Sequence, residues 1–181
     1  MKRTLFAAVV AASLIAGVAR SARATEVGYS RNFGLGVVLG DPTGLSAKLW
    51  VGRTNALDFG LGFWGYGVTD RCFADSNGNQ VCDHYGYHNG SINVDYLWQS
   101  NIIRSTAQLD WHVGVGGRMV FWGGGCPNDC VDLIARAPIG LDLMFQNPNF
   151  LEVFFEVAFG LYLIPPVYPD LEGGLGVRFY F

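Results

Sequence analysis

The sequence predicts an all-β chain that closes into an antiparallel barrel of eight strands. Three observations predict this fold. Apolar and polar residues alternate with a period of two along most of the chain, as they do in strands with two different faces. The more polar face is rich in glycine, and short links between the strands alternate with longer ones. We find no convincing amphipathic helix in the same region.

Eight segments carry the alternation, and the last is the clearest. Leu175, Val177 and Phe179 share one face there, with Arg178 and Tyr180 on the other. We expect strands over 33–39, 43–51, 57–66, 91–98, 109–121, 132–145, 151–163 and 171–181. Proline cannot donate a ladder hydrogen bond, so Pro138 predicts a bulge or a local break in its strand.

The N-terminus has the features of an export signal. Lys2 and Arg3 precede an apolar run over Leu5–Val18, and Ala22–Ala24 matches an A-x-A cleavage site. The run is too short for a membrane-spanning helix, which disfavours the alternative of a retained anchor. We therefore expect a signal peptide over 1–24 and one barrel domain over 25–181.

The charge of the exported chain excludes one class of partner. Four of the twelve Lys and Arg residues lie before Thr25, so the mature chain keeps eight of them against fifteen Asp and Glu residues. No basic tract remains, and nucleic acid is not an expected partner. Half of the residues are hydrophobic and only 15% are charged, which is unusual for a protein surrounded by water.

The character of the two faces predicts which one points outward. In a soluble lipocalin-like barrel the apolar face lines a pocket. Here the polar face mixes isolated charges with glycines, which suits a crowded interior. The other face is nearly continuous Leu, Val, Ile and Phe, which would be a large sticky patch in water but costs nothing in lipid. We therefore expect a transmembrane β-barrel, with a lipocalin-like carrier as an alternative.

The links between strands predict two different rims. Gly52–Asn55 and Gln146–Asn149 are expected as tight turns and Gln99–Ser105 as a somewhat longer link. The opposite rim would carry the loops Gly67–Gly90 and Gly123–Cys130, apart from a tight turn at Asp41-Pro42. In outer-membrane barrels the short rim faces the periplasm. This pattern predicts localisation in the cell outer membrane.

Both cysteine-bearing loops are candidates for special chemistry. Four cysteines in an exported chain suggest two disulfides, and three pairings are open. We prefer the local pairs, which are Cys72 with Cys82 and Cys126 with Cys130.

The longest loop also contains alternating oxygen ligands, as calcium loops do. Gln80 and Gly86 stand where an EF-hand needs glycine and glutamate, so calcium is a weak candidate and no cofactor is expected. Zinc bound by His84 and His88 with two cysteines is weaker still. The calcium candidates are Asp75, Asn77, Asn79 and Asp83.

The signal, the alternating strands and the terminal segment Gly176–Phe181 resemble the small outer-membrane barrels of the OmpA, OmpX and OmpW type. The resemblance is one of architecture and spans the mature chain. It implies that the C-terminal strand, with Phe179 and Phe181, is the signal read by the barrel-assembly machinery. It also implies outer-membrane lipid and lipopolysaccharide as surroundings.

The inward charges are the main candidate site. An eight-stranded barrel is only wide enough for its own side chains to fill it. We therefore expect an ion-pair plug, and a proton or ion path is the alternative. Because no serine follows His112 on its strand, we expect it to be a hydrogen-bonding residue and not a catalytic base. The predicted lumen network comprises Lys48, Asp58, Asp95, Asp110, His112, Arg118, Asp132, Arg136, Asp142, Glu152, Glu156, Glu172 and Arg178.

The function predicted from the sequence is that of a non-enzymatic outer-membrane barrel. It would act structurally or through an extracellular ligand or surface partner of its longer loops. The alternatives are a minor conduit for small apolar molecules, a lipid A-modifying enzyme, and the soluble carrier. For the enzyme, Ser76, Asp83 and His84 are the only loop residues with suitable chemistry, and no spacing motif supports them.

Overall fold

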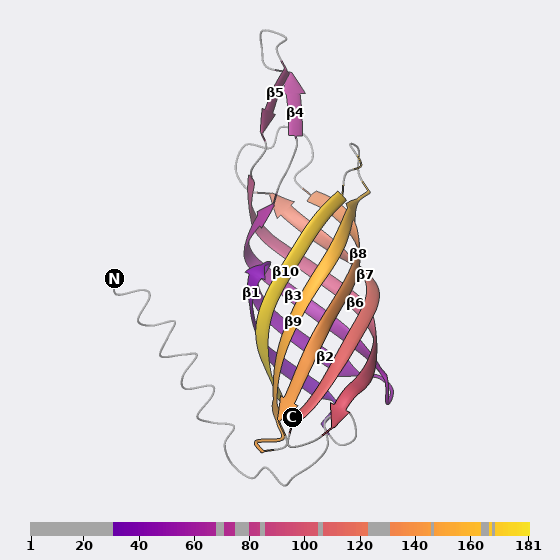
Figure 1. Cartoon of the computed structure of the whole chain (residues 1–181). Coiled ribbons are helices and arrows are strands. Elements are labelled where there is room, and N and C mark those ends of the chain that lie inside the picture. The colour runs from indigo at the N-terminus through magenta and orange to yellow at the C-terminus, as the bar shows by residue number, and fades with distance from the viewer. Residues whose placement is uncertain are drawn as a thin grey trace, which may run out of the picture.

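The computed structural model of the chain is a closed β-barrel with a small hairpin at one end (Figure 1). It describes residues 31–67, 71–74, 80–83, 86–104, 107–122, 131–145, 147–163, 167 and 169–181. The expected signal peptide over 1–24 and the start of the mature chain lie outside these residues.

Eight antiparallel strands form the barrel, which confirms the predicted fold class. Their order around the barrel is β1-β10-β9-β8-β7-β6-β3-β2, and β1 also pairs with β2 to close it. Within the described residues no helix is long and apolar enough to cross a membrane. The barrel strands are β1 (Phe33–Asp41), β2 (Thr43–Trp50), β3 (Asn55–Gly67), β6 (Gly86–Arg104), β7 (Ala107–Trp122), β8 (Val131–Phe145), β9 (Leu151–Tyr162) and β10 (Pro169–Tyr180).

The two ends of the barrel differ. The links β2–β3, β6–β7 and β8–β9 lie at one end, which we call the short-turn rim. There the N–H of Phe181 donates to the carbonyl of Phe33 at 2.9 Å, so the barrel begins and ends at the same rim. The opposite end, the loop rim, carries a hairpin of β4 (Arg71–Ala74) and β5 (Gln80–Asp83) that projects away from the barrel (Figure 1).

Two of the predicted links are wrong in part. The expected loop over Gly67–Gly90 contains β4, β5 and the first residues of β6. The expected link over Gln99–Ser105 is mostly strand, because β6 pairs with β7 as far as Arg104 with Gln108. Neither stretch shows a sustained alternation of apolar and polar residues. Backbone pairing extends the strand there without a buried apolar face.

Pro138 disturbs its strand less than predicted. β8 runs through it, and Pro138 pairs with Ala158 of β9. On the other side, pairing with β7 lapses at Pro138 and Ala137 and resumes at Arg136 in the same register. Of the two predicted outcomes, the bulge does not form and the local break is confirmed, on the β7 side only, where the missing N–H interrupts the ladder. The described register shifts occur near strand ends, at Thr43/Gly44, His88/Gly90 and Asn101/Ile103.

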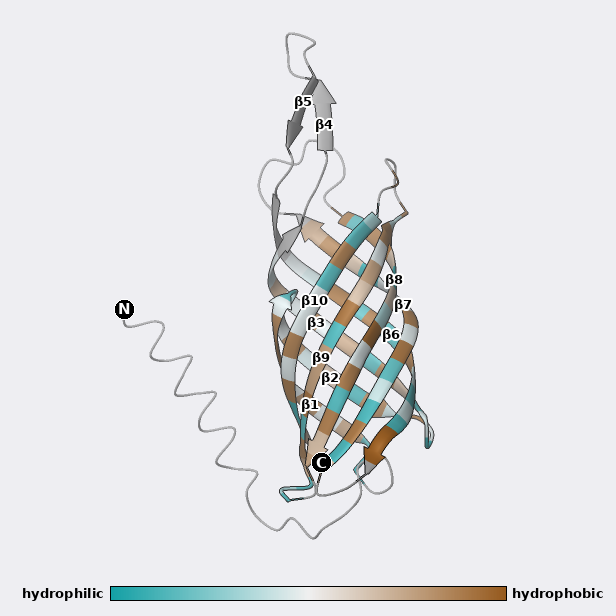
Figure 2. Ribbon diagram, viewed as in Figure 1, coloured by the Kyte–Doolittle hydropathy of each residue, from teal (hydrophilic) through white to brown (hydrophobic). Residues whose placement is uncertain are grey.

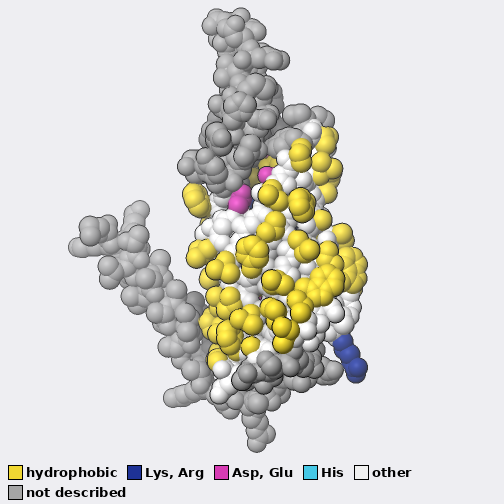
Figure 3. Space-filling model, in the orientation of Figure 1, with side chains coloured by type: hydrophobic (Ala, Val, Ile, Leu, Met, Phe, Trp, Pro, Cys, Tyr) yellow, Lys and Arg dark blue, Asp and Glu magenta, His cyan; other side chains and the backbone are white. Residues whose placement is uncertain are grey.

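Burial alternates along the strands and separates the two faces. Ile139 is 49% exposed on the outside of β8, whereas Asp142 of the same strand is fully buried. Figure 2 shows the alternation as hydrophobic and hydrophilic bands, and Figure 3 shows the hydrophobic side chains spread over the outer surface. Strict alternation from Phe63 would place Trp64 inward, but Trp64 is exposed like Phe63, near the register shift at the start of β2.

Apolar side chains also close parts of the interior. One cluster lies toward the short-turn rim, where β2, β8 and β10 end, and it consists of Trp50, Ala56, Leu97, Met144 and Tyr180. A second cluster lies toward the loop rim, where β7 and β9 end, and it consists of Val120, Ile134 and Tyr162. The polar interior therefore lies between two apolar clusters.

Inward glycines make room for the long side chains of the interior, and two glycines of β10 allow this to be tested. A Cβ on the buried Gly176 would collide with the ring of Phe154 and the carbonyl of Val37, whereas on Gly173 the nearest atoms would be 3.5 and 3.8 Å away. We expect Gly176→Ala to lower the free energy of unfolding by about 1–3 kcal/mol through overpacking. Gly173→Ala should change it by less than about 0.5 kcal/mol. Urea unfolding of the purified protein, followed by circular dichroism, measures both, and equal effects would contradict this account of the interior.

Candidate functional site

The structure places all the predicted lumen residues inside the barrel, each 9% exposed or less. Side chains alternate between the two faces of a strand, so inward positions recur at every second residue. Seven of the barrel strands, β2, β3 and β6–β10, contribute to the set. It is Lys48, Asp58, Asp95, Asp110, His112, Arg118, Asp132, Arg136, Asp142, Glu152, Glu156, Glu172 and Arg178.

One group of charges lies toward the short-turn rim. The Nζ of Lys48 is 3.2 Å from Oδ1 of Asp142 and 3.7 Å from Oε2 of Glu152. The guanidinium of Arg178 reaches Oε1 of Glu152 at 2.8 Å and Oδ1 of Asp58 at 2.6 Å. We call Lys48, Asp58, Asp142, Glu152 and Arg178 the short-turn group.

Arg178 connects the members of this group across the barrel by contacts with several strands. Its Nε donates to Oγ of Ser46 at 2.8 Å, and its guanidinium lies 3.7 Å above the ring of Phe154. The hydroxyl of Tyr180 donates to Glu152 at 2.6 Å. One side chain of β10 thereby contacts β2, β3 and β9, which a fork of five N–H donors allows and a lysine would not.

A second group lies toward the loop rim. The guanidinium of Arg136 is 2.7 Å from Asp95, 2.8 Å from Glu156 and 3.3 Å from Glu172. Arg118 is 2.7 Å from the same Glu172. Glu172 therefore lies between two guanidiniums. We call Asp41, Asp95, Arg118, Arg136, Glu156 and Glu172 the loop-side group.

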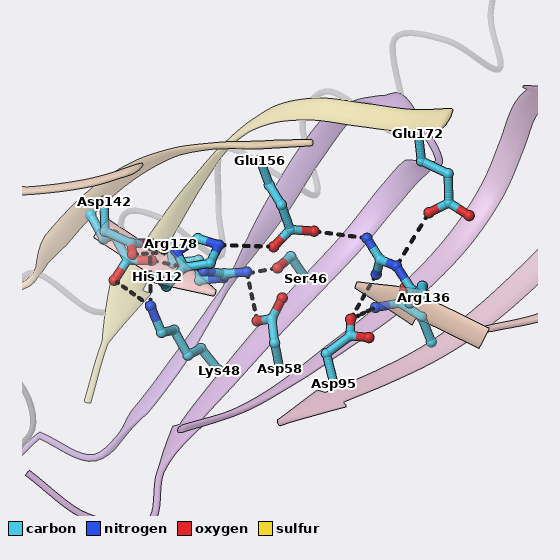
Figure 4. Close-up of polar contacts among 12 residues, drawn as sticks. Ser46, Lys48, Asp58, Asp95, His112, Arg136, Asp142, Glu156, Glu172 and Arg178 are labelled. Carbon is cyan, nitrogen blue, oxygen red and sulfur yellow. Dashed lines mark hydrogen bonds and ion pairs between the residues drawn. The ribbon is translucent and has the colours of Figure 1, made fainter. Parts of the chain in front are cut away.

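His112 joins the two groups. Its Nδ1 lies 2.6 Å from Asp142 of the short-turn group, and its Nε2 lies 3.2 Å from Glu156 of the loop-side group. Figure 4 shows the ring between these carboxylates. Sequence spacing suggests Asp110 and Arg118 as neighbours, because both are inward positions of the same strand. The partners come instead from β8 and β9.

Two of the predicted lumen acids lie near the ends of their strands. Asp110 accepts hydrogen bonds from the amides of Gln99 at 3.0 Å, Asn101 at 2.7 Å and Gln108 at 2.9 Å. Neutral amides therefore solvate this carboxylate close to the short-turn rim. Asp132 is buried near the start of β8, toward the loop rim.

Sequence reasoning did not single out several members of the network. Ser46, Asn93 and Tyr180 lie at inward positions of their strands, so the alternation could have found them. Asp41 lies 3.2 Å from Arg118, but it is at the end of β1 beside the turn, where alternation gives no signal.

A small cavity of about 30 Å³ lies beside the network. One water molecule needs about 10–15 Å³ of such space, so the cavity holds about two. Its lining includes Asp41, Asp58, Glu156, Arg178 and Gly174. Within the part of the chain that the structure describes, the cavity lies among buried side chains that fill the interior around it.

The arrangement is suited to holding the barrel closed. The guanidiniums of Arg118 and Arg136 do not give up protons, so the chain of ion pairs between the rims cannot pass protons by side-chain transfer alone. In the part of the chain described by the structure, no group of three or more His, Cys, Asp or Glu side chains is arranged to hold a metal ion.

Most of the candidate metal-binding, catalytic and disulfide residues in the loops lie outside the described residues. Of the calcium candidates, Asp75, Asn77 and Asn79 lie outside the described residues, and only the backbone of Asp83 is described, in β5. Ser76 and His84, from the enzyme alternative, also lie outside them, as does the pair Cys126 and Cys130.

The register of the β4–β5 hairpin bears on the other cysteine pair. Cys72 and Cys82 are directly opposed in it. Opposed residues of antiparallel strands have Cα atoms about 4.5–5.5 Å apart, which lies within the range of a disulfide. We expect peptide mapping without reduction to recover the Cys72–Cys82 and Cys126–Cys130 cross-links. Recovery of a cross-link between the two loops would contradict this pairing.

The energetic role of the plug can be tested at Arg178. Arg178→Met leaves Asp58 and Glu152 buried without their guanidinium, and the loss of one partner of a buried pair costs about 3–5 kcal/mol. Arg178→Lys should cost less, because it keeps the charge. Arg53→Met, at the exposed β2–β3 link, is the matched control and should stay within about 0.5 kcal/mol. Urea unfolding measures all three variants, and equal midpoints for Arg178→Met and Arg53→Met would show that the plug does not stabilise the barrel.

The interior site is thus a set of buried ion pairs that links all eight barrel strands, with Asp41 contributing from β1, and leaves room for little besides water. A comparison of the chain with protein-family models, curated proteins and solved structures found no match. The functional argument therefore depends on the chemistry of the two faces of the barrel.

Proposed function

We propose that this chain is a non-enzymatic outer-membrane β-barrel protein that acts structurally or through its surface, with a lumen closed by ion pairs. The single observation that carries the proposal is the distribution of side chains. Large hydrophobic side chains are exposed on the outside, and charged side chains are buried on the inside. This is the reverse of a protein surrounded by water.

The outer apolar surface covers every side of the barrel. Leu35 of β1, Val94 of β6, Val115 of β7, Phe155 of β9 and Leu175 of β10 are each between 44% and 54% exposed. Figure 3 shows one face of this surface, where hydrophobic side chains predominate along the barrel wall. Soluble monomers rarely expose apolar patches beyond a few hundred Å². Contact with lipid removes the free-energy cost of exposing such a surface to water.

Closure of the sheet supports the same environment. Hydrocarbon offers no hydrogen-bond partner, so a spanning structure must satisfy its own backbone groups. The barrel achieves this by pairing β10 with β1 along eight residue pairs, from Gly34 with Tyr180 to Asp41 with Gly173.

Aromatic residues lie near both ends of the apolar surface. Trp98 is 45% exposed and Phe181 50% exposed near the short-turn rim, and Phe63 is 58% exposed toward the loop rim. Such residues commonly lie at the two interfaces of a bilayer. By the same pattern the short-turn rim would face the periplasm, and the β4–β5 hairpin would be extracellular.

The C-terminal strand fits recognition by the barrel-assembly machinery. Phe179 stacks on Phe150 of the β8–β9 link at 6.2 Å, and Phe181 is half exposed beyond the strand. Together with the exposed barrel wall, this strand supports the resemblance to small outer-membrane barrels. Lipopolysaccharide and outer-membrane lipid are then the immediate partners.

The interior favours a structural or surface role over transport. A cavity of about 30 Å³ is too small for a solute, and the charges around it are already paired. An inward charged face also disfavours the lipocalin-like carrier, which needs an apolar pocket. Recognition of an extracellular ligand or surface partner would then fall to the loops and the hairpin.

A charged residue introduced on the apolar outer face tests whether that face is surrounded by lipid or by water. Ile139 is 49% exposed near the middle of β8, so Ile139→Arg would cost nothing in water. At the bilayer midplane an arginine costs about 2–4 kcal/mol. We expect wild type, expressed as the full chain in a Gram-negative host, to fractionate with the outer membrane and to migrate on gels as a folded species until it is boiled. Ile139→Arg should greatly reduce this folded membrane fraction.

The matched control places the same charge on an outward position near the short-turn rim. Ser100 of β6 is exposed and pairs with Trp111, so Ser100→Arg should leave the folded membrane fraction near the wild-type level. Recovery of wild type as a soluble protein without detergent would overturn the proposal. So would unchanged assembly of Ile139→Arg.

A further inference from the structure

Among the contacts of the described residues, His112 is the only side chain that bonds to both charged groups of the plug. The short-turn group is held together by Lys48 and Arg178, and the loop-side group by Arg118 and Arg136. Among the described residues, the contacts that link the two groups run through the imidazole. The ring is 1% exposed, so water does not replace its hydrogen bonds.

The two partners of His112 fix the protonation of the ring. Asp142 is ion-paired with Lys48, and Glu156 is ion-paired with Arg136, so both are carboxylates that accept hydrogen bonds. A neutral imidazole has one N–H and one lone pair, and it can donate to only one of them. Two acceptors on opposite ring nitrogens therefore require N–H at both positions, which is the imidazolium.

We propose that His112 is a protonated joint between the two halves of the plug, and that loss of one of its protons releases Glu156 and uncouples the halves. The contact distances indicate which bond fails. The Asp142 contact is 2.6 Å and fully buried, whereas the Glu156 contact is 3.2 Å and the Glu156 side chain is 11% exposed. The remaining proton stays on Nδ1, and the lone pair of Nε2 then faces the Glu156 carboxylate.

The cavity beside the network can accommodate the Glu156 carboxylate after its release from His112. Glu156 lines it together with Asp41, whose side chain is 19% exposed at the loop rim. Room for about two water molecules lets the released carboxylate be hydrated while it keeps its bond to Arg136. Asp41 and Pro42, at the turn between β1 and β2, also line the cavity, so we expect the joint to respond to pH on that side.

Charges from several strands face the ring and set its titration together. Asp142 of β8 and Glu156 of β9 attract the imidazolium by direct contact, and Lys48 of β2 opposes it while sharing Asp142. Asp58 of β3 attracts it from a longer distance, and this acid is itself paired with Arg178 of β10. The two carboxylates in contact with the ring are the nearest charges.

The first test observes the ring directly. His84→Gln with His88→Gln leaves His112 as the only one of the three histidines. ¹⁵N NMR of this protein in detergent micelles, labelled at histidine, should show both ring nitrogens protonated at pH 7. At higher pH a single transition should lead to the Nδ1–H tautomer. A neutral ring at pH 7 would overturn the proposal, as would a neutral form with its proton on Nε2.

The second test asks whether the proton couples the halves. Loss of a charge-assisted hydrogen bond should raise the unfolding rate of the wild type about tenfold as pH rises through the His112 transition. The stabilisation is present below this transition and lost above it. His112→Gln should remove the pH dependence. If the same rise persists in His112→Gln, other groups cause it and the proposal is wrong.

A matched control changes a lumen acid that belongs to neither group. Asp110→Asn alters the separate amide cluster, so it should keep the full pH dependence of the wild type. If His112→Gln does not fold, the NMR titration still decides the protonation of the ring. This inference rests on the closed lumen of the proposed function, and a soluble location would overturn that function without changing either test.

Discussion

The narrow bore of an eight-stranded barrel is the constraint on which the rest of the structure depends. Closure leaves an interior that side chains must fill, and the outer face is too apolar to accept any of the charges. Each inward charge must therefore find a counter-charge across the bore or, as Asp110 does, hydrogen bonds from neutral amides. An unpaired one would bear the full penalty of burial without compensation. The plug follows from closing this sequence with its hydrocarbon face outward.

Glycine and arginine solve the packing problem together. Arg118 and Arg178 are among the largest fully buried side chains, and each crosses toward strands that are not its neighbours. Glycines at inward positions, such as Gly116 beside Asp95 and Gly176 beside Phe154, leave the space that these long side chains and their partners occupy. The inward face of each single strand, which is rich in glycine, thus becomes part of a dense and polar core once the barrel has closed.

The sequence allowed the strands and their faces to be predicted, because alternation is a local property that survives without knowledge of partners. It did not predict which charges meet. Lys48 contacts Asp142 94 residues away, and Arg178 contacts Ser46 132 residues away. These distances depend on register and tilt, which a period of two does not encode. For the same reason His112 was matched with charges of its own strand, and the polar ends of β6 were assigned to loops.

The chemistry of the plug is unevenly distributed along the barrel. Near the short-turn rim, Tyr180 contributes both to the apolar cluster with Trp50 and Leu97 and to a hydrogen bond with Glu152, so packing and polar contacts support each other. Toward the loop rim, the charges border a cavity with room for water and end at the partly exposed Asp41. The guanidiniums within each half keep their charge over the whole accessible pH range, whereas the contact between the halves passes through an imidazole. Release of Glu156 from the imidazole would consequently loosen the plug on the side of the loop rim and leave the short-turn group intact.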